Sequence, residues 1–220
     1  MTDKATDLLP PEAEIALAWS GAKVRGPLSM ALHLDRRLAR IVARNREPML
    51  GQMRLAWWRD ALGMPVGERP RGDAVLDGIG VHWAGRECAL TGLVNAWEVL
   101  VTADQLGPRE IENFAAGRGA FFAAFAGNEA RDDLSDRLVA AGRCWALADA
   151  ASKVSDDKER ATLIAAGLAA TQRAGRLPRD LRGLAVLEAL AFRSLRHGGR
   201  PLMEGRGAPL TVLRAAIFGS

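Results

Sequence analysis

No stretch of this 220-residue sequence alternates apolar and polar residues between turn signals, which is the pattern of a half-buried β-strand. Ala, Leu and Arg, all good helix formers, dominate the chain. β-branched residues, which favour strands, are sparse, and tyrosine is absent. The sequence therefore predicts an all-α fold, in the form of an orthogonal helical bundle.

Proline and glycine divide the chain into helices. Pro108, Pro178 and Pro209 each stand where the first turn of a helix accepts proline, because the missing N–H has no intrahelical partner there. The pair Gly26-Pro27 is expected to end the first helix, and residues 63–72 are expected to form a loop. The predicted helices are residues 12–23, 28–46, 48–62, 73–83, 87–104, 108–126, 132–153, 156–173, 178–196 and 209–218.

Composition narrows the class of protein. Hydrophobic residues make up 49% and charged residues 25% of the chain, as in globular proteins with a sizeable core. The net charge of +4 is a small surplus for a nucleic-acid-binding protein. The apolar runs are too short to span a membrane, and the first residues lack the apolar region of a secretory signal. Cys88 and Cys144 are too few for a disulfide framework.

No internal repeat or linker divides the chain. We therefore expect one cytoplasmic domain over residues 1–220, with residues 1–11 forming a flexible N-terminus.

The most distinctive segment is EPMLGQMRLAWWRDAL, residues 47–62. On a helix, Leu50, Met53 and Trp57 share one stripe, and Trp58 lies on the adjoining one. The ordinary interpretation is an amphipathic core helix in which both tryptophan rings supply buried area. Tandem tryptophan with arginine on both sides is nonetheless a rare string.

That string, RLAWWRDAL at residues 54–62, resembles a segment of the squalene/phytoene synthase family. Three further segments resemble family segments in the same order and cover most of the chain. They are residues 27–50 (the first helix pair), GRCWALADAA at 142–151 (the family's GxAxQLTN segment) and GRLPRDLRGLAVLEAL at 175–190 (the LP-containing approach to the last helices). The chain is shorter than typical synthases. The resemblance implies an all-α, isoprenoid-synthase-like orthogonal helical bundle around a central cavity.

Active members of this family join two prenyl diphosphates, and Mg²⁺ neutralises the leaving diphosphate. Asp-rich helices hold the metal, because DxxxD spacing puts two carboxylates one turn apart. Here the first motif position keeps Asp35, but Ala39 stands where its partner carboxylate is expected. At the second, Asp149 occupies the position of the family's Asn, and Ser152-Lys153 replace its Arg-Asp pair. Both motifs therefore predict that the metal-dependent reaction has been lost.

A literal DDxxD string, Asp132-Asp133-Leu134-Ser135-Asp136, lies between these two positions. Because it opens a predicted helix, we interpret its carboxylates as caps of free N–H groups, and we interpret Asp156-Asp157 in the same way. The three histidines lack the spacing of a metal site.

Arginine is the remaining compositional signal. Residues 171–220 contain nine Arg against three acidic residues, a net +6. Such a segment is either a solvated rim or a contact for anionic lipid headgroups or an acidic partner. A second strip on residues 28–46 contains Arg36, Arg37, Arg40, Arg44 and Arg46, and could bind an anion such as diphosphate without metal. Neither strip is interleaved with aromatic residues, which disfavours nucleic acid.

We therefore predict a squalene/phytoene synthase-like protein that has lost metal-dependent prenyl transfer and acts as a binding or assembly protein. The eroded motifs also resemble the mitochondrial complex I assembly factors, which implies a role in respiratory complex I assembly. The alternative is an active Mg²⁺-dependent prenyl-diphosphate transferase in isoprenoid biosynthesis. Its catalytic candidates are Asp35 and Asp149, together with Asp132, Asp133 and Asp136 of the DDxxD string. A third possibility is a membrane-surface or partner-binding module that uses the basic C-terminal segment.

The candidate cavity or ligand-binding residues are Arg36, Arg54, Trp57 and Trp58, and no metal ligand is assigned. We expect no cofactor in the leading interpretation and Mg²⁺ in the alternative. The expected partner is a protein or a prenyl-diphosphate-like ligand, with peripheral membrane contact through the Arg-rich C-terminal half and without nucleic acid. The expected location is the cytoplasm, peripheral to a membrane.

Overall fold

The computed structural model describes residues 8–44, 47–103, 105–127, 132–171 and 175–219. All regular structure in these ranges is helical, which confirms the predicted all-α class. The α-helices are α1 (Pro11–Ala18), α2 (Ala22–Arg44), α3 (Pro48–Gly63), α4 (Ala74–His82), α5 (Cys88–Thr102), α6 (Pro108–Gly119), α7 (Asp132–Ala151), α8 (Asp157–Ala170), α9 (Arg182–Arg196) and α10 (Ala208–Phe218). Within the described residues, three short 3₁₀ segments lie between them, namely η2 (Val66–Glu68), η3 (Ala120–Phe125) and η4 (Arg179–Leu181).

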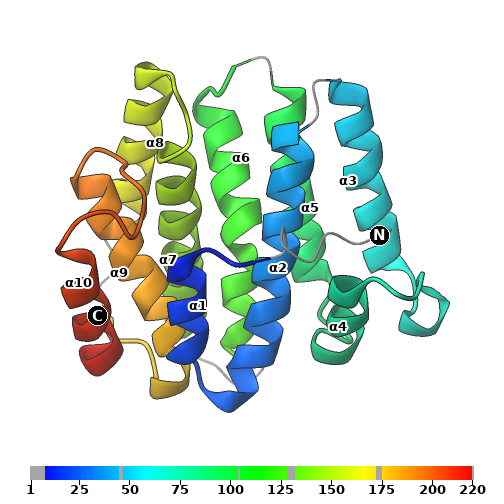
Figure 1. Cartoon of the computed structure of the whole chain (residues 1–220), viewed down its shortest axis with the longest axis horizontal. Helices are drawn as coiled ribbons and strands as arrows, with labels where there is room; N and C mark the ends of the chain where they lie inside the picture. The colour runs from blue at the N-terminus through cyan, green and yellow to red at the C-terminus, as the bar shows by residue number, and fades with distance from the viewer. Residues whose placement is uncertain (1–7, 45–46, 104, 128–131, 172–174, 220) are drawn as a thin grey trace.

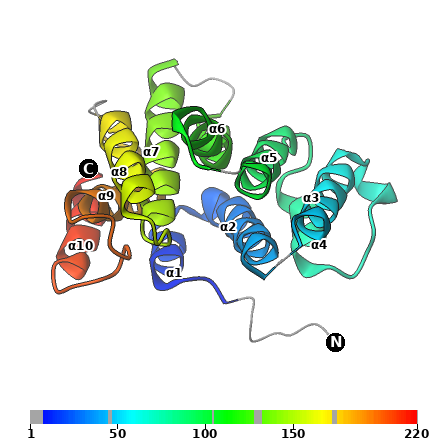
Figure 2. The ribbon, with the colours of Figure 1, turned by 90° about the horizontal axis from the view of Figure 1, so that it is seen from above.

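The longer helices lie side by side and build an elongated bundle (Figure 1). α6 packs between α5 and α7, while α2 packs against α4 and α5. α3 and α4 lie at one end of the long axis, and α9 and α10 lie at the other (Figures 1 and 2). None of the described helices combines the length and apolar character that crossing a membrane requires.

The predicted end of the first helix at Gly26-Pro27 is wrong. α1 ends at Ala18, and α2 begins at Ala22 and runs through both residues. The chain turns at Gly21, whose N–H donates to the Asp180 carbonyl at 2.9 Å and where a Cβ would come within 2.6 Å of the Asp180 side chain. Pro27 lies inside α2, where its missing N–H removes one hydrogen bond of the helix, and α2 continues through it. Its carbonyl accepts a hydrogen bond from the Trp83 indole at 2.8 Å.

The helix predicted for residues 108–126 also changes form. α6 ends at Gly119, and residues 120–125 continue as the tighter η3. At this point the backbones of α6 and α7 touch, because a Cβ on Gly119 would lie 2.5 Å from the carbonyl carbon of Gly142. This close approach brings the last turn of α6 against α7 and so positions the side chain of Arg118.

The N-terminal residues expected to be flexible fall into two parts. Residues 1–7 lie outside the described ranges. Leu9 is buried in the core, and Pro11 already begins α1. The described part of this segment is therefore packed on the bundle.

Candidate functional site

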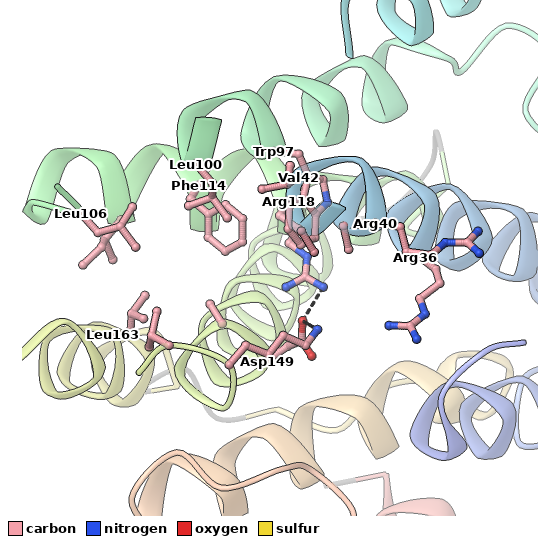
Figure 3. Close-up of a pocket in the computed structure, with 16 residues that line it drawn as sticks. Arg36, Arg40, Val42, Trp97, Leu100, Leu106, Phe114, Arg118, Asp149 and Leu163 are labelled. Carbon is pink, nitrogen blue, oxygen red and sulfur yellow. Dashed lines mark hydrogen bonds and ion pairs between the residues drawn. The ribbon is translucent and has the colours of Figure 1, made fainter. Parts of the chain in front are cut away.

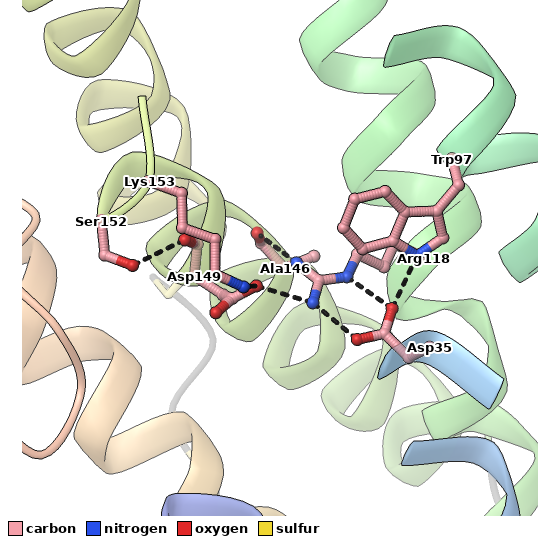
Figure 4. Close-up of polar contacts among 7 residues, drawn as sticks. All are labelled: Asp35, Trp97, Arg118, Ala146, Asp149, Ser152 and Lys153. Atoms are coloured by element: carbon pink, nitrogen blue, oxygen red, sulfur yellow. Dashed lines mark hydrogen bonds and ion pairs between the residues drawn. The ribbon is translucent and has the colours of Figure 1, made fainter. Parts of the chain in front are cut away.

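A buried arginine lies between Asp35 and Asp149, the acidic residues at the two motif positions that the sequence singles out. Arg118, on the last turn of α6, is 2% exposed. Its Nε and Nη2 donate to the two carboxylate oxygens of Asp35 on α2, at 2.8 and 2.7 Å. The same Nη2 lies 2.7 Å from Oδ2 of Asp149 on α7 (Figure 4). One guanidinium thus bridges both carboxylates.

Aromatic rings enclose this guanidinium. Its carbon lies 4.4 Å from the ring centroid of Trp145, 4.8 Å from that of Trp97 and 5.6 Å from that of Phe114. The Trp97 indole N–H also donates to Oδ1 of Asp35 at 2.7 Å. Cation–π contacts and charge-assisted hydrogen bonds are both strengthened where water is excluded. Arg118 is therefore a fixed cation, and its ion pairs raise its pKa further although burial lowers it.

Asp149 is held by a second cation. Lys153 Nζ donates to Asp149 Oδ2 at 2.7 Å, one helical turn away on the surface side. Ser152, the other residue at this motif position, donates instead to the Asp149 backbone carbonyl at 2.7 Å. Burial raises the pKa of Asp149, but Arg118 and Lys153 outweigh it and lower this pKa to about 2. The carboxylate is therefore ionised at neutral pH, and the two Asp charges are matched by one Arg and one Lys.

The Mg²⁺ that the family resemblance implies for active members does not fit this arrangement. Both oxygens of Asp35 accept from Arg118, and Asp149 Oδ2 lies against Arg118 and Lys153. Mg²⁺ needs carboxylate oxygens from facing helices together with substrate phosphates. A metal ion at this position would lie against the bridging guanidinium, and like charges in a buried site repel strongly.

A cavity of about 270 Å³ lies beside the cluster. Its walls are mainly apolar and come from α2, α5, α6, α7, α8 and the adjoining loops. Leu106 and Leu163 lie at one end of the cavity, whereas Arg36 and Arg40 lie at the other (Figure 3). Ala39, at the position of the missing carboxylate, lines the wall. The site is therefore an apolar chamber with cationic side chains on one side.

A smaller hollow of about 30 Å³ adjoins the cluster on the α1 side. Glu12, Asp35, Arg36 and Lys153 contribute to its lining. Burial raises the pKa of Glu12, while nearby Lys153 and Arg36 act in the opposite direction. α1 thus covers the polar side of the cluster and brings a carboxyl group close to it.

The predicted cavity residues divide between two places. Arg36 and Asp149 line the apolar chamber. Asp35 pairs with Arg118 and lines the smaller hollow on the α1 side instead. Arg54, Trp57 and Trp58 line a separate open hollow of about 300 Å³ between α2 and α3. Arg37, Arg40 and Arg44 of the predicted basic strip also line that hollow, and Arg46 lies outside the described residues. α2 therefore separates residues that the sequence groups together.

The expectation that both tryptophan rings of α3 are buried is correct for Trp58 and wrong for Trp57. Trp58 packs in the core with Leu55, whereas Trp57 is 43% exposed, in edge contact with Trp58. Leu50 and Met53, on the stripe of Trp57, are also exposed. α3 is an edge helix that packs mainly against α5, so only one of its two apolar stripes finds a partner.

The DDxxD string opens α7, as the capping interpretation expects. Asp133 is exposed, and its carboxylate accepts from the N–H of Leu134 at 2.9 Å. The side chain of Asp132 lies outside the described residues. The cap at the next helix is confirmed, since Asp156 accepts from the N–H of Glu159 at 2.8 Å.

The sequence reasoning missed Arg118 and the rings around it. One signal was available. Arg118 stands between two glycines in the apolar stretch AAGRGAFF, with Phe or Ala at every position three or four residues away. A helical arginine without an acidic neighbour at these spacings cannot form a local ion pair. It either faces solvent or finds its carboxylate on another helix, as Arg118 does.

Comparison of the chain with models of known protein families, with curated proteins and with solved structures finds no match. The squalene/phytoene synthase resemblance therefore stays a prediction.

Proposed function

We propose that this chain is a squalene/phytoene synthase-like protein with an isoprenoid-synthase-like bundle, that it has lost metal-dependent prenyl transfer, and that it acts as a binding or assembly protein. The observation that carries the proposal is the Arg118 bridge between Asp35 and Asp149. A side-chain cation lies between Asp35, which keeps one metal-motif position of the family, and Asp149, which stands where the family has Asn.

Arg118 is a poor substitute for Mg²⁺ in the ionisation of a prenyl diphosphate. Ionising a prenyl diphosphate requires a cation whose charge is available to the leaving group. The charge of Arg118 is already shared by two carboxylates, and its donors Nε, Nη1 and Nη2 are occupied by Asp35, Asp149 and the Ala146 carbonyl. The same contacts suit a structural role, because they fix α2, α6 and α7 against one another.

The direct test is turnover. Purified full-length protein is incubated with Mg²⁺ and radiolabelled farnesyl or geranylgeranyl diphosphate, and diphosphate release is followed with product extraction. We expect no release above the rate without protein. Mg²⁺-dependent release that Asp35→Asn and Asp149→Ala each abolish would instead establish the alternative, an active transferase that uses Asp35 and Asp149.

The apolar chamber supports the binding part of the proposal. Its ends differ in chemistry, so a prenyl-diphosphate-like ligand can place its chain against Leu106 and Leu163 and its anionic group near Arg36 and Lys153. Because a ligand that binds the native state raises Tm, thermal melts with farnesyl diphosphate in EDTA measure this step apart from turnover. We expect a shift that Leu163→Gln reduces. Equal melting with and without ligand would leave the protein without this site and favour a purely protein partner.

The assembly role that we propose is in respiratory complex I. It is supported by the resemblance of the eroded motifs to those of the mitochondrial complex I assembly factors. The measurement is the amount of assembled complex I on native gels after deletion of the gene from its own host. We expect this amount to fall, and to recover when the wild-type gene is restored. Unchanged complex I would remove this role while leaving the ligand-binding test standing.

A further inference from the structure

The C-terminal helix α10 buries small apolar side chains and exposes large ones, which is the reverse of an ordinary surface helix. It buries small side chains against its neighbours, namely Ala208, Val212, Ala215 and Ala216. It exposes large apolar ones, which are Leu210 (71% exposed), Leu213 (50%), Ile217 (47%) and Phe218 (55%). A surface helix normally turns its large apolar side chains towards the core. A contiguous exposed apolar face of this kind marks a surface that another body covers.

The exposed side chains of α10 form one face. Leu210, Leu213 and Ile217 lie within about 60° of one another around the helix axis, because each residue advances by about 100°. Arg214 belongs to the same face, since it follows Leu210 and precedes Phe218 by four positions each. The face thus combines apolar side chains with a cation.

The helix is held firmly in this orientation. Gly219, in a left-handed conformation at its end, donates to the Ala215 carbonyl at 2.8 Å. The Gly219 carbonyl accepts from the N–H of Leu177 at 3.2 Å, and Arg182 donates to the Ile217 carbonyl at 2.9 Å. The apolar face is therefore a preformed feature of the bundle.

The surroundings of this face are positively charged. Arg193, Arg196 and Arg214 line a hollow of about 580 Å³ between α9 and α10. Two acidic residues of the segment, one of which (Glu188) lines the same hollow, are paired with arginines. Glu188 is held by both Nη atoms of Arg137, and Glu204 lies 3.5 Å from Arg200. The charge next to α10 thus complements an anionic surface.

We propose that the exposed face of α10 docks on the surface of an anionic lipid bilayer. Leu210, Leu213, Ile217 and Phe218 enter the boundary between headgroups and acyl chains, and Arg214 and its neighbours meet lipid phosphates. This narrows the membrane contact expected from the Arg-rich C-terminal half to one helix face. It is independent of the loss of prenyl transfer.

A second copy of the chain fits this face less well than a bilayer does. A two-fold contact through α10 would bring the Arg214 side chains of both copies together, and like charges between apolar surfaces oppose association. α3, at the other end of the bundle, also exposes apolar side chains such as Leu50 and Met53. It buries the large Leu55 and Trp58, however, so its exposed stripe is the remainder of an ordinary core helix and supplies a matched control.

The test is co-sedimentation of the full-length protein with vesicles. One set contains phosphatidylcholine and phosphatidylglycerol in equal parts, and the other contains phosphatidylcholine alone. The test variant is Leu213→Gln/Ile217→Gln, and the control is Leu50→Gln/Met53→Gln, which changes equally exposed apolar residues on α3. Arg214→Glu tests the charge, and circular dichroism verifies that each variant is folded.

We expect binding to the anionic vesicles at low ionic strength and release at high salt, because exposed charges are screened. The α10 pair should weaken partitioning about tenfold or more, since two large apolar side chains no longer enter the interface. Arg214→Glu should also weaken it, and the α3 pair should bind like wild type. Absent binding at low salt, equal binding to phosphatidylcholine alone, or equal loss in both pairs would each overturn the proposal. A change of oligomeric state in the α10 pair without vesicle binding would assign the face to a second copy.

Discussion

Replacing Arg118 with methionine tests the buried cluster most directly. Methionine fills much of the space between Trp97 and Trp145 but carries no charge, so Asp35 and Asp149 lose the cation that they share. Removing one partner of a buried ion pair costs about 3–5 kcal/mol, because the remaining charge is left without compensation. In a chain of this size about 1 kcal/mol corresponds to about 2–4 °C, so we expect Tm to fall by roughly 10 °C.

The pH dependence separates lost charge pairing from lost packing. In the wild type, burial raises the pKa of Asp149, but Arg118 and Lys153 together lower it from the ordinary 3.8 to about 2. Because the folded-state pKa is the lower one, this group contributes roughly 2 kcal/mol of stability above about pH 4, which is lost as the pH falls towards 2. Without Arg118, only Lys153 opposes the effect of burial on the pKa of Asp149, so the folded-state pKa rises from about 2. Arg118→Met should therefore gain less stability than the wild type as the pH rises from about 3 to about 8.

Denaturant unfolding across pH 3–8 measures both effects, and Asp35→Asn/Arg118→Met is the matched control. Neutralising Asp35 removes a carboxylate that the single variant leaves without its guanidinium, so the double variant should be more stable than Arg118→Met at neutral pH. A Tm of Arg118→Met within about 2 °C of wild type would refute the reasoning. So would a double variant no more stable than the single one.

Three further outcomes follow from burial and backbone packing. Trp58→Ala should cost about 3–5 kcal/mol in denaturant unfolding and Trp57→Ala less than about 1 kcal/mol, because only Trp58 is buried, so equal costs would contradict the placement of α3. Gly119→Ala should cost at least about 2 kcal/mol, since its Cβ would meet the α7 backbone at 2.5 Å, and an unchanged Tm would contradict that contact. Burial raises the pKa of the Cys144 thiol, so a maleimide should label the native protein at the exposed Cys88 and both cysteines only after unfolding, as mass spectrometry would show. Labelling of Cys144 in the native protein would count against the buried core of α7.

The helical class and most helix boundaries were predictable from the sequence because they depend on local chemistry. Pro48 and Pro108 begin helices as expected, and Asp156 caps one. The boundary at Gly21 was not predictable, because it depends on Asp180, a residue distant in the sequence. Gly26-Pro27 is a stronger local signal for a helix end, but α2 continues through both residues.

Of the residues in the candidate site, only the carboxylates Asp35 and Asp149 were predictable from the sequence. Asp35 and Asp149 stand at positions that a family motif marks, so a pattern search finds them. Arg118 has no such motif, and its role depends on the contact of Gly119 with Gly142, which places α6 against α7. No local pattern encodes that distance. The exposed face of α10 was hidden for the same reason, because its apolar residues would have served equally well in a core.

The bridge gives Asp35 and Asp149 a structural role that needs no metal. Once a buried guanidinium lies between Asp35 and Asp149, loss of either carboxylate leaves part of a buried charge uncompensated, at a cost of the same order as the loss of Arg118. Such carboxylates contribute to stability whether or not they ever meet a metal. An Asp at each motif position is therefore weak evidence for catalysis by itself. What decides between a metal site and a structural cluster is the third residue, and here that residue is an arginine enclosed by Trp97, Trp145 and Phe114.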